Sequence, residues 1–281
     1  MEKARKILKE VALSMVKPNP EMKVIALGMG MQSTALYLMS SMGEFERADY
    51  AVFSDPGAEH KDTYKLLDWL LDWKDKNNGI PLIINKKQNL LNDVLNQQNL
   101  YGGKWASIPA FSESGGMVRR QCTNDYKILP VIKSMREIYG LKKHKRMPLT
   151  EMWLGITIDE AQRMKVNQNP RIINRYPFLE LMMNRSDCRY FMEKNGFPIP
   201  VKSACVFCPY HSNSMWKDMK KENDLAWEII LSVDKAIRDS SQRGESDKLY
   251  LHRSCKPIDE IDFDENQIDM FDNECDGHCG L

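Results

Sequence analysis

The sequence predicts an α/β fold: a doubly wound, mostly parallel sheet joined to a smaller helical region that contains cysteines. Short runs of β-branched and apolar residues alternate with amphipathic helical segments through the first half of the chain. A turn that contains Gly28 and Gly30 follows the first such run and opens a helix. The 281 residues are 42% hydrophobic and 28% charged, which is ordinary globular usage and excludes collagen-like and wholly disordered chains.

We expect four parts along the chain. Residues 1–20 form a leading amphipathic helix that KPNP ends. Residues 21–174 form the main α/β domain. Its expected strands cover 22–27, 50–54, 81–85 and 152–156, and its expected helices cover 34–42, 60–76 and 125–139. Strand–helix units of this length predict right-handed crossovers and a ligand site beyond the carboxyl ends of the strands.

The two remaining parts are a helical cysteine-containing region, 175–257, and an acidic tail, 258–281. Within the former we expect helices over 186–195 and 213–238, the second as one long helix. The tail has nine acidic residues and no Lys or Arg; the chain has a net charge of +1, so the first 257 residues carry +10. A basic body favours an anionic substrate or nucleic acid, and the tail either folds over that body or is simply solvated.

Neither a membrane span nor a secretory signal is evident. The apolar runs are far shorter than the ~20 residues that cross a bilayer, and the first residues lack a signal-peptide core. We therefore expect a cytoplasmic protein without membrane contact. Seven cysteines, an odd number, then indicate reduced thiols engaged in metal or sulfur chemistry rather than a disulfide framework.

The glycine turn suits the binding of an anion. Backbone N–H groups at a helix N-terminus face the ligand, the glycines permit close approach, and Ser33 and Thr34 add hydroxyl donors. The turn matches neither the dinucleotide fingerprint nor the Walker P-loop, which argues against both of those sites. The alternative is a purely structural tight turn.

Four segments, in order, resemble the PP-loop superfamily of adenine nucleotide α-hydrolase-like proteins, and especially its phosphoadenosine phosphosulfate (PAPS) reductase branch. The segments are ALGMGMQSTAL, FSDPGAEHKDTY, RRQCTNDYKILP and WLGITIDEAQRM. Gln32 stands where that branch has Gln, whereas Thr157 replaces its Arg. The resemblance implies a nucleotide site made by Gly28, Met29, Gly30, Gln32, Ser33, Thr34, Asp55, Gly57, Gly155 and Asp159, with Lys127 and Arg163 as catalytic cations.

Four cysteines are candidate metal ligands: Cys122, Cys188, Cys205 and Cys208, the last two in a CxxC. Four thiolates can hold a [4Fe–4S] cluster or a tetrahedral zinc ion, and the spacing does not choose between them. The resemblance to PP-loop thiolases and adenylyl-sulfate reductases favours the cluster. The alternative is ordinary thiols without a metal.

The tail resembles, in part, the ending that carries the nucleophilic cysteine of PAPS reductases. In ECDGHCGL either Cys275 or Cys279 is the counterpart, and a thiol on a tail can attack sulfur and then be reduced. The alternative is an end with incidental cysteines. Lys142–Arg146 is a compact basic run that either contacts nucleic-acid phosphates or is a solvated loop.

Two enzymatic hypotheses and one non-enzymatic hypothesis follow. In the first, ATP with Mg²⁺ adenylates a nucleic acid or small molecule, and a sulfur donor such as a cysteine desulfurase supplies sulfur; Thr157 and the CxxC favour it. In the second, PAPS or adenylyl sulfate (APS) is reduced through a tail cysteine that a thioredoxin-like partner resets; Gln32 and the tail favour it. The third is a nucleotide-sensing module without turnover. We also expect a homo-oligomer.

Overall fold

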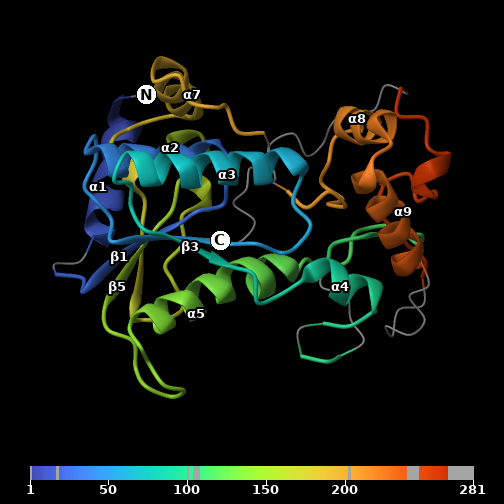
Figure 1. The fold of residues 1–281 in the computed structure, drawn as a ribbon, viewed down its shortest axis with the longest axis horizontal. Helices are drawn as coiled ribbons and strands as arrows, with labels where there is room; N and C mark the ends of the chain where they lie inside the picture. The colour runs from blue at the N-terminus through green and yellow to red at the C-terminus, as the bar shows by residue number, and fades with distance from the viewer. Residues whose placement is uncertain are drawn as a thin grey trace.

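The computed structural model describes residues 2–16, 19–99, 101–103, 108–201, 204–238 and 247–264 (Figure 1). Its centre is a five-stranded, entirely parallel sheet with the order β3-β2-β1-β5-β6. The strands are β1 Met22–Ala26, β2 Tyr50–Ser54, β3 Leu82–Asn85, β5 Thr150–Trp153 and β6 Ile172–Arg175. The chain runs outward from β1 to β3 and then returns to β5 beside β1, so the strand order reverses between β1 and β5.

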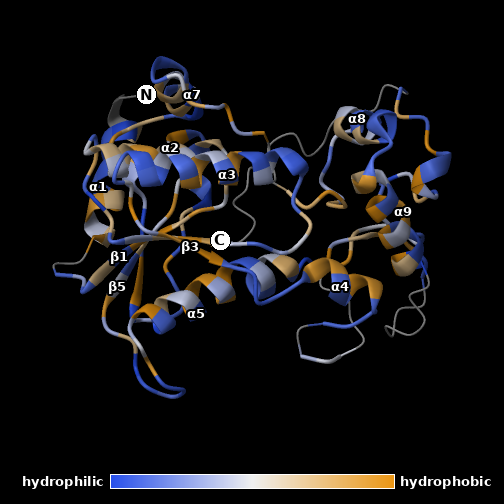
Figure 2. Cartoon of the chain, viewed as in Figure 1, coloured by the Kyte–Doolittle hydropathy of each residue, from blue (hydrophilic) through white to orange (hydrophobic). Residues whose placement is uncertain are grey.

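Alternate side chains of the central strands pack into two separate hydrophobic cores, one on each face of the sheet. Ile25, Phe53 and Trp153 pack on one face, whereas the preceding residues Val24, Val52 and Met152 pack on the other. Figure 2 shows these strands as largely hydrophobic. Strands buried on both faces need continuous apolar runs, which explains the sequence pattern and confirms the predicted parallel α/β sheet.

Helices cover both faces (Figure 1). One face is covered by α2 Met31–Met42, α3 Lys61–Lys76 and α7 Arg185–Lys194. The other face is covered by α5 Leu129–Ile138. Two more helices pack near β6: α1 Glu2–Met15 and α6 Pro177–Glu180. The predicted leading helix and the helices after the first two strands are confirmed. The predicted helix over 125–139 begins as a π-helical turn, Asn124–Ile128, before α5.

A second group of helices packs beside the sheet, at the right of Figure 1. It consists of α4 Leu90–Leu95, α8 Asn213–Glu222 and α9 Leu225–Arg238, with a short antiparallel pair, β4 Phe111–Ser112 and β7 Leu249–Tyr250. This group of helices has a hydrophobic core of its own, which includes Trp216, Trp227 and Ile230. The prediction of one helix over 213–238 was wrong, because Asn223 adopts a left-handed conformation (φ 45°) that ends α8.

Strand β6 and the 3-10 helix Ile158–Arg163 were not predicted. No helix in the described segments is long and apolar enough to cross a membrane.

Candidate functional site

The turn between β1 and α2 is held by one hydroxyl. Ser33 Oγ accepts a hydrogen bond from the Gly28 amide and donates one to the Gly30 carbonyl, each 3.2 Å long. Gly30 is the N-cap residue in an extended conformation, and no side chain caps the first turn of α2. The turn therefore leaves the N-terminus of α2 without a side-chain partner, at the carboxyl edge of the sheet.

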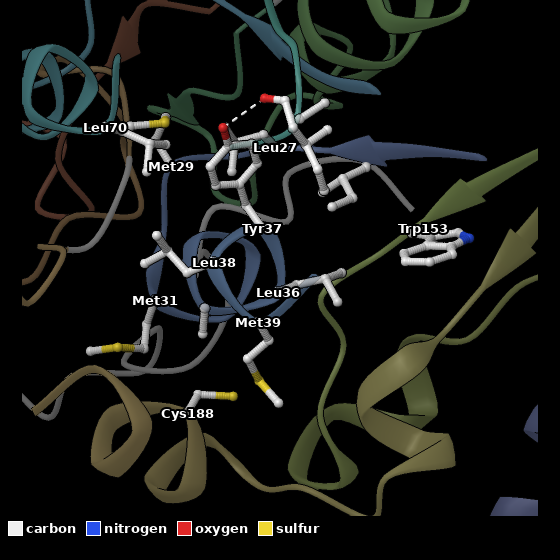
Figure 3. Close-up of a cluster of buried hydrophobic side chains, with 14 of the residues drawn as sticks. Leu27, Met29, Met31, Leu36, Tyr37, Leu38, Met39, Leu70, Trp153 and Cys188 are labelled. Atoms are coloured by element: carbon white, nitrogen blue, oxygen red, sulfur yellow. Dashed lines mark hydrogen bonds between the residues drawn. The ribbon is translucent and has the colours of Figure 1, made fainter. Parts of the chain in front are cut away.

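Met29, a predicted ligand-binding residue, takes a left-handed conformation (φ 59°) and is completely buried. In Figure 3 its side chain lies beside Leu70 in the core that covers α2. Only the backbone of Met29 is thus available to a ligand.

Gly155 lies directly against this turn. A Cβ atom at Gly155 would stand 2.9 Å from the Ser33 nitrogen, closer than real Cβ contacts allow, and 3.0 Å from the Gln32 carbonyl carbon, which is tighter than most of them. The loop after β5 therefore touches the first turn of α2, at the point where the strand order reverses. Open α/β sheets bind their ligands at this point.

Three buried polar side chains at this junction have no hydrogen-bond partner. Both amide atoms of Gln32 and the hydroxyls of Thr34 and Thr157 are unpaired, and all three residues are at most 1% exposed. An unsatisfied buried polar group costs about 1–3 kcal/mol, so such groups are rare and require an explanation. A bound ligand that pairs with them is one such explanation.

Asp55 and Gly57 form the turn after β2. Asp55 Oδ1 accepts hydrogen bonds from the Gly57 amide (2.8 Å) and the Tyr64 hydroxyl (2.9 Å), and burial together with the Asp55 charge raises the pKa of Tyr64. Gly57 needs its positive φ of 86°, and a Cβ there would strike Asn89 at 2.8 Å. The Asp55 carboxylate therefore stabilises the turn in which it lies.

Asp159 and Arg163 belong to the 3-10 helix after β5. Asp159 Oδ2 accepts a hydrogen bond from the amide of Arg185, the first residue of α7 (2.7 Å), and Arg163 Nη1 pairs with Glu160 Oε1 at 3.1 Å. The structure thus places Asp159 and Arg163 in contacts within the protein, on the loop that also contains Thr157.

Cys122, Cys205 and Cys208 line one small cavity of about 30 Å³, together with Lys127. The CxxC loop reaches it by pairing with the loop after β2: Glu59 and Cys205 form an antiparallel bridge, and the Val206 amide donates to the Ala58 carbonyl at 2.9 Å. Three of the four predicted metal ligands are therefore brought together, beside the carboxyl end of β2.

A buried ion pair faces these thiols. Lys127 Nζ lies 2.9 Å from Glu59 Oε1, and the Glu59 side chain has no exposed surface. Burial opposes the Lys127 charge, but Glu59 and Cys205 outweigh it and raise the pKa of Lys127. Burial raises the pKa of Cys122 to about 11 and also raises those of Cys205 and Cys208, so the thiols are protonated at neutral pH.

Cys188 does not join them. It is completely buried on α7, and Figure 3 shows it next to Met31 and Met39 of α2, in the other core. Burial and then Asp187 raise its pKa to about 12. As the side chains stand, no three His, Cys, Asp or Glu residues of the described segments converge on a metal position. Cys275 and Cys279 lie outside the described residues.

Glu59 was not predicted. It lies in the charged stretch Glu59–Asp62, where one acid is indistinguishable from its neighbours. Only its bridge to Cys205 and its pairing with Lys127 reveal it.

The chain matches no protein-family model and no curated protein. The geometry of the site is therefore the basis for assigning a function.

Proposed function

We propose that this protein binds an adenine nucleotide where the strand order reverses and uses it in sulfur transfer to an acceptor. The observation that carries the nucleotide site is Gln32, a buried amide with both polar atoms unpaired beside the first turn of α2. The hydroxyls of Thr34 and Thr157 offer further donors nearby.

The first turn of α2 supplies the positive end for phosphate. Its N–H groups meet no capping side chain, and the helix dipole favours an anion there by about 0.3–1 kcal/mol. Gly155 matters for the same reason, because its missing Cβ lets the β5 loop close against this turn.

The thiols beside β2 supply the sulfur chemistry. Thiolates are the ligands that iron–sulfur clusters and zinc prefer, and the three cysteines line one cavity, although their side chains would have to turn toward a common point to serve as three ligands. Cys188 supplies no fourth ligand in this arrangement. A bound cluster or zinc ion would keep these thiols deprotonated, against the effect of burial on their pKa values.

We favour ATP-dependent adenylation and thiolation over reduction of PAPS or APS. A sulfate-binding enzyme benefits from an arginine aimed at the sulfate, whereas Thr157 is neutral and Arg163 is paired with Glu160. The reductase alternative depends on Cys275 or Cys279. The residue that specifically supports the reductase alternative is Gln32, because it carries no negative charge that would recruit the Mg²⁺ used in ATP cleavage.

Gln32→Leu tests the nucleotide site. Leucine removes the unpaired amide with little change in volume, so the free energy of unfolding should stay equal or rise, while calorimetry should show ATP affinity falling at least about tenfold. Gln98→Leu, at an exposed glutamine, is the matched control and should bind ATP normally. Unchanged ATP affinity in Gln32→Leu would contradict the proposed site.

A second experiment separates the two enzymatic hypotheses. Anaerobically purified protein should release pyrophosphate or AMP from ATP when an acceptor is present, and Cys205→Ser should stop thiolation while leaving ATP binding intact. Release of sulfite from PAPS or APS, abolished by deleting residues 272–281, would instead establish the reductase.

A further inference from the structure

The loop between α5 and β5 carries the most concentrated positive charge in the described chain. Lys142, Lys143, His144, Lys145 and Arg146 follow one another, and all five are exposed. None of the four permanent cations forms an ion pair with a described residue, whereas Lys65, Lys76, Arg189 and Lys217 all do. Their charge is therefore open to a partner.

The loop is fixed to the fold at both ends. Arg136 Nη2 donates to the Lys142 carbonyl (3.0 Å), and the Lys145 amide donates to the same carbonyl (3.2 Å), which makes a turn whose tip, His144, has φ 70°. After the turn, Met147 is buried in the core with Val131 and Met152. Figure 1 shows the loop projecting from the body below α5, and Figure 2 colours it hydrophilic.

Its position separates it from the nucleotide site. The loop leads into the first residue of β5, Thr150, and so lies at the amino edge of the parallel sheet, whereas Gln32 and Gly155 lie at the carboxyl edge. The cations therefore cannot bind the phosphates of a nucleotide in the proposed site, and a separate anionic partner is required to use them.

We propose that residues 142–146 bind the phosphate backbone of a double-stranded nucleic acid. A duplex presents one negative charge per about 1.7 Å, which suits four cations on one short projecting turn. No Phe, Tyr or Trp lies between Leu141 and Leu149, so the loop lacks the large aromatic side chains on which the unpaired bases of a single strand stack. Leu141 and Leu149 are partly buried and Met147 is buried, so the loop offers no exposed apolar side chain for insertion into a membrane. Contacts to phosphates alone do not read the base sequence.

The test is fluorescence anisotropy with the full chain and short labelled duplexes of DNA and of RNA. Binding should weaken steeply with salt, and K142A/K143A/K145A/R146A should lower affinity at least about tenfold at ~0.1 M salt. It should also reduce the slope of log K against log salt by up to about 4, at about 0.9 per lost phosphate contact. The DNA and RNA arms identify which duplex is preferred.

A matched control removes the same number of positive charges from paired positions: K65A/K76A/R189A/K217A should bind the duplex like the wild type. Equal loss in both variants, or unchanged binding in the loop variant, would overturn the proposal. So would loop-dependent binding to vesicles of phosphatidylserine and phosphatidylcholine without binding to duplexes. ATP affinity, measured alongside, should be unchanged in the loop variant, which keeps this test independent of the proposed nucleotide site.

Discussion

Replacing Gly155 with alanine should disrupt the proposed site without changing any charge. The added Cβ would stand 2.9 Å from the Ser33 nitrogen, 3.0 Å from the Gln32 carbonyl carbon and 3.1 Å from the Ser33 Cα. All three atoms are backbone, so no side chain can rotate away. The first turn of α2 must therefore move from the β5 loop by a few tenths of an ångström.

The cost follows from the nature of this contact. Overpacking a tight junction by one methyl group costs about 1–3 kcal/mol, and Gly155 has no positive φ that would add backbone strain. The displaced turn contains Ser33, whose hydroxyl holds the loop at both Gly28 and Gly30. We therefore expect a loss of stability in this range and a fall in ATP affinity of at least about tenfold, which corresponds to about 1.4 kcal/mol.

Gly43→Ala is the matched control. Gly43 ends the same helix with φ 81°, and a Cβ there meets nothing within 4 Å, so alanine costs about 1–2 kcal/mol through backbone strain alone. Urea unfolding should show similar destabilisation in both variants, whereas calorimetry should show weaker ATP binding only in Gly155→Ala. Equal ATP affinity in the two variants would refute the placement of the nucleotide against this junction.

Three further predictions concern buried charge. Arg175→Met should reduce the free energy of unfolding by about 3–5 kcal/mol in urea titrations, because it leaves the buried carboxylate of Glu151 without its cation. Lys127→Met should destabilise the protein at pH 7, because it removes the ammonium that lies 2.9 Å from the fully buried carboxylate of Glu59, and calorimetric scans should show a lower melting temperature. Burial and Arg253 lower the pKa of His252 to about 4, so stability should fall by roughly 3 kcal/mol between pH 6.5 and pH 4, and His252→Asn should flatten that fall.

Two of these predictions, Arg175→Met and His252→Asn, have a matched control variant. Arg189→Met, at an exposed pair with Glu193, should change stability by less than about 1 kcal/mol. His144→Asn, on the exposed loop, should leave the pH profile unaltered. Equal stability of Lys127→Met and the wild type would contradict a stabilising role of the buried ion pair, and an unchanged acid profile in His252→Asn would show that His252 does not cause the loss of stability in acid.

The parallel sheet was predictable because its strands are buried on both faces. Continuous apolar runs such as Ala51–Phe53 are typical of buried parallel strands, and the glycine turn marks the end of the first strand and the beginning of the next helix. Strand β6 was missed because Asn174 and Arg175 interrupt its apolar run, although the fold buries both. The break at Asn223 was missed because the amphipathic pattern continues on both sides of it.

The cysteines show where sequence spacing fails. Cys122 lies more than eighty residues before Cys205, yet the two line one cavity, because the loop after β2 pairs with the CxxC loop. Cys188 is far closer to Cys205 in the chain but points into the core against α2. Which face of a helix is buried depends on the elements that pack against it. The position of one cysteine in the sequence of α7 does not indicate which elements those are.

Chemistry at the thiols should influence the nucleotide edge through one short segment. Asp55 fixes the turn after β2, and four residues later Glu59 both bridges Cys205 and pairs with Lys127. Deprotonating the thiols, by metal binding or otherwise, would place negative charge beside Glu59. The positive charge of Lys127 would then contribute more to the stability of this cluster. Lys127 lies in the π-helical turn before α5, and Ser54 Oγ donates to the carbonyl of Tyr126 in the same turn at 2.7 Å. Direct contacts therefore link the thiols to the end of β2, and we expect a change at the thiols to affect that end of the strand. ATP affinity should accordingly differ between the metal-loaded and metal-free protein, and should lose that difference in Lys127→Met.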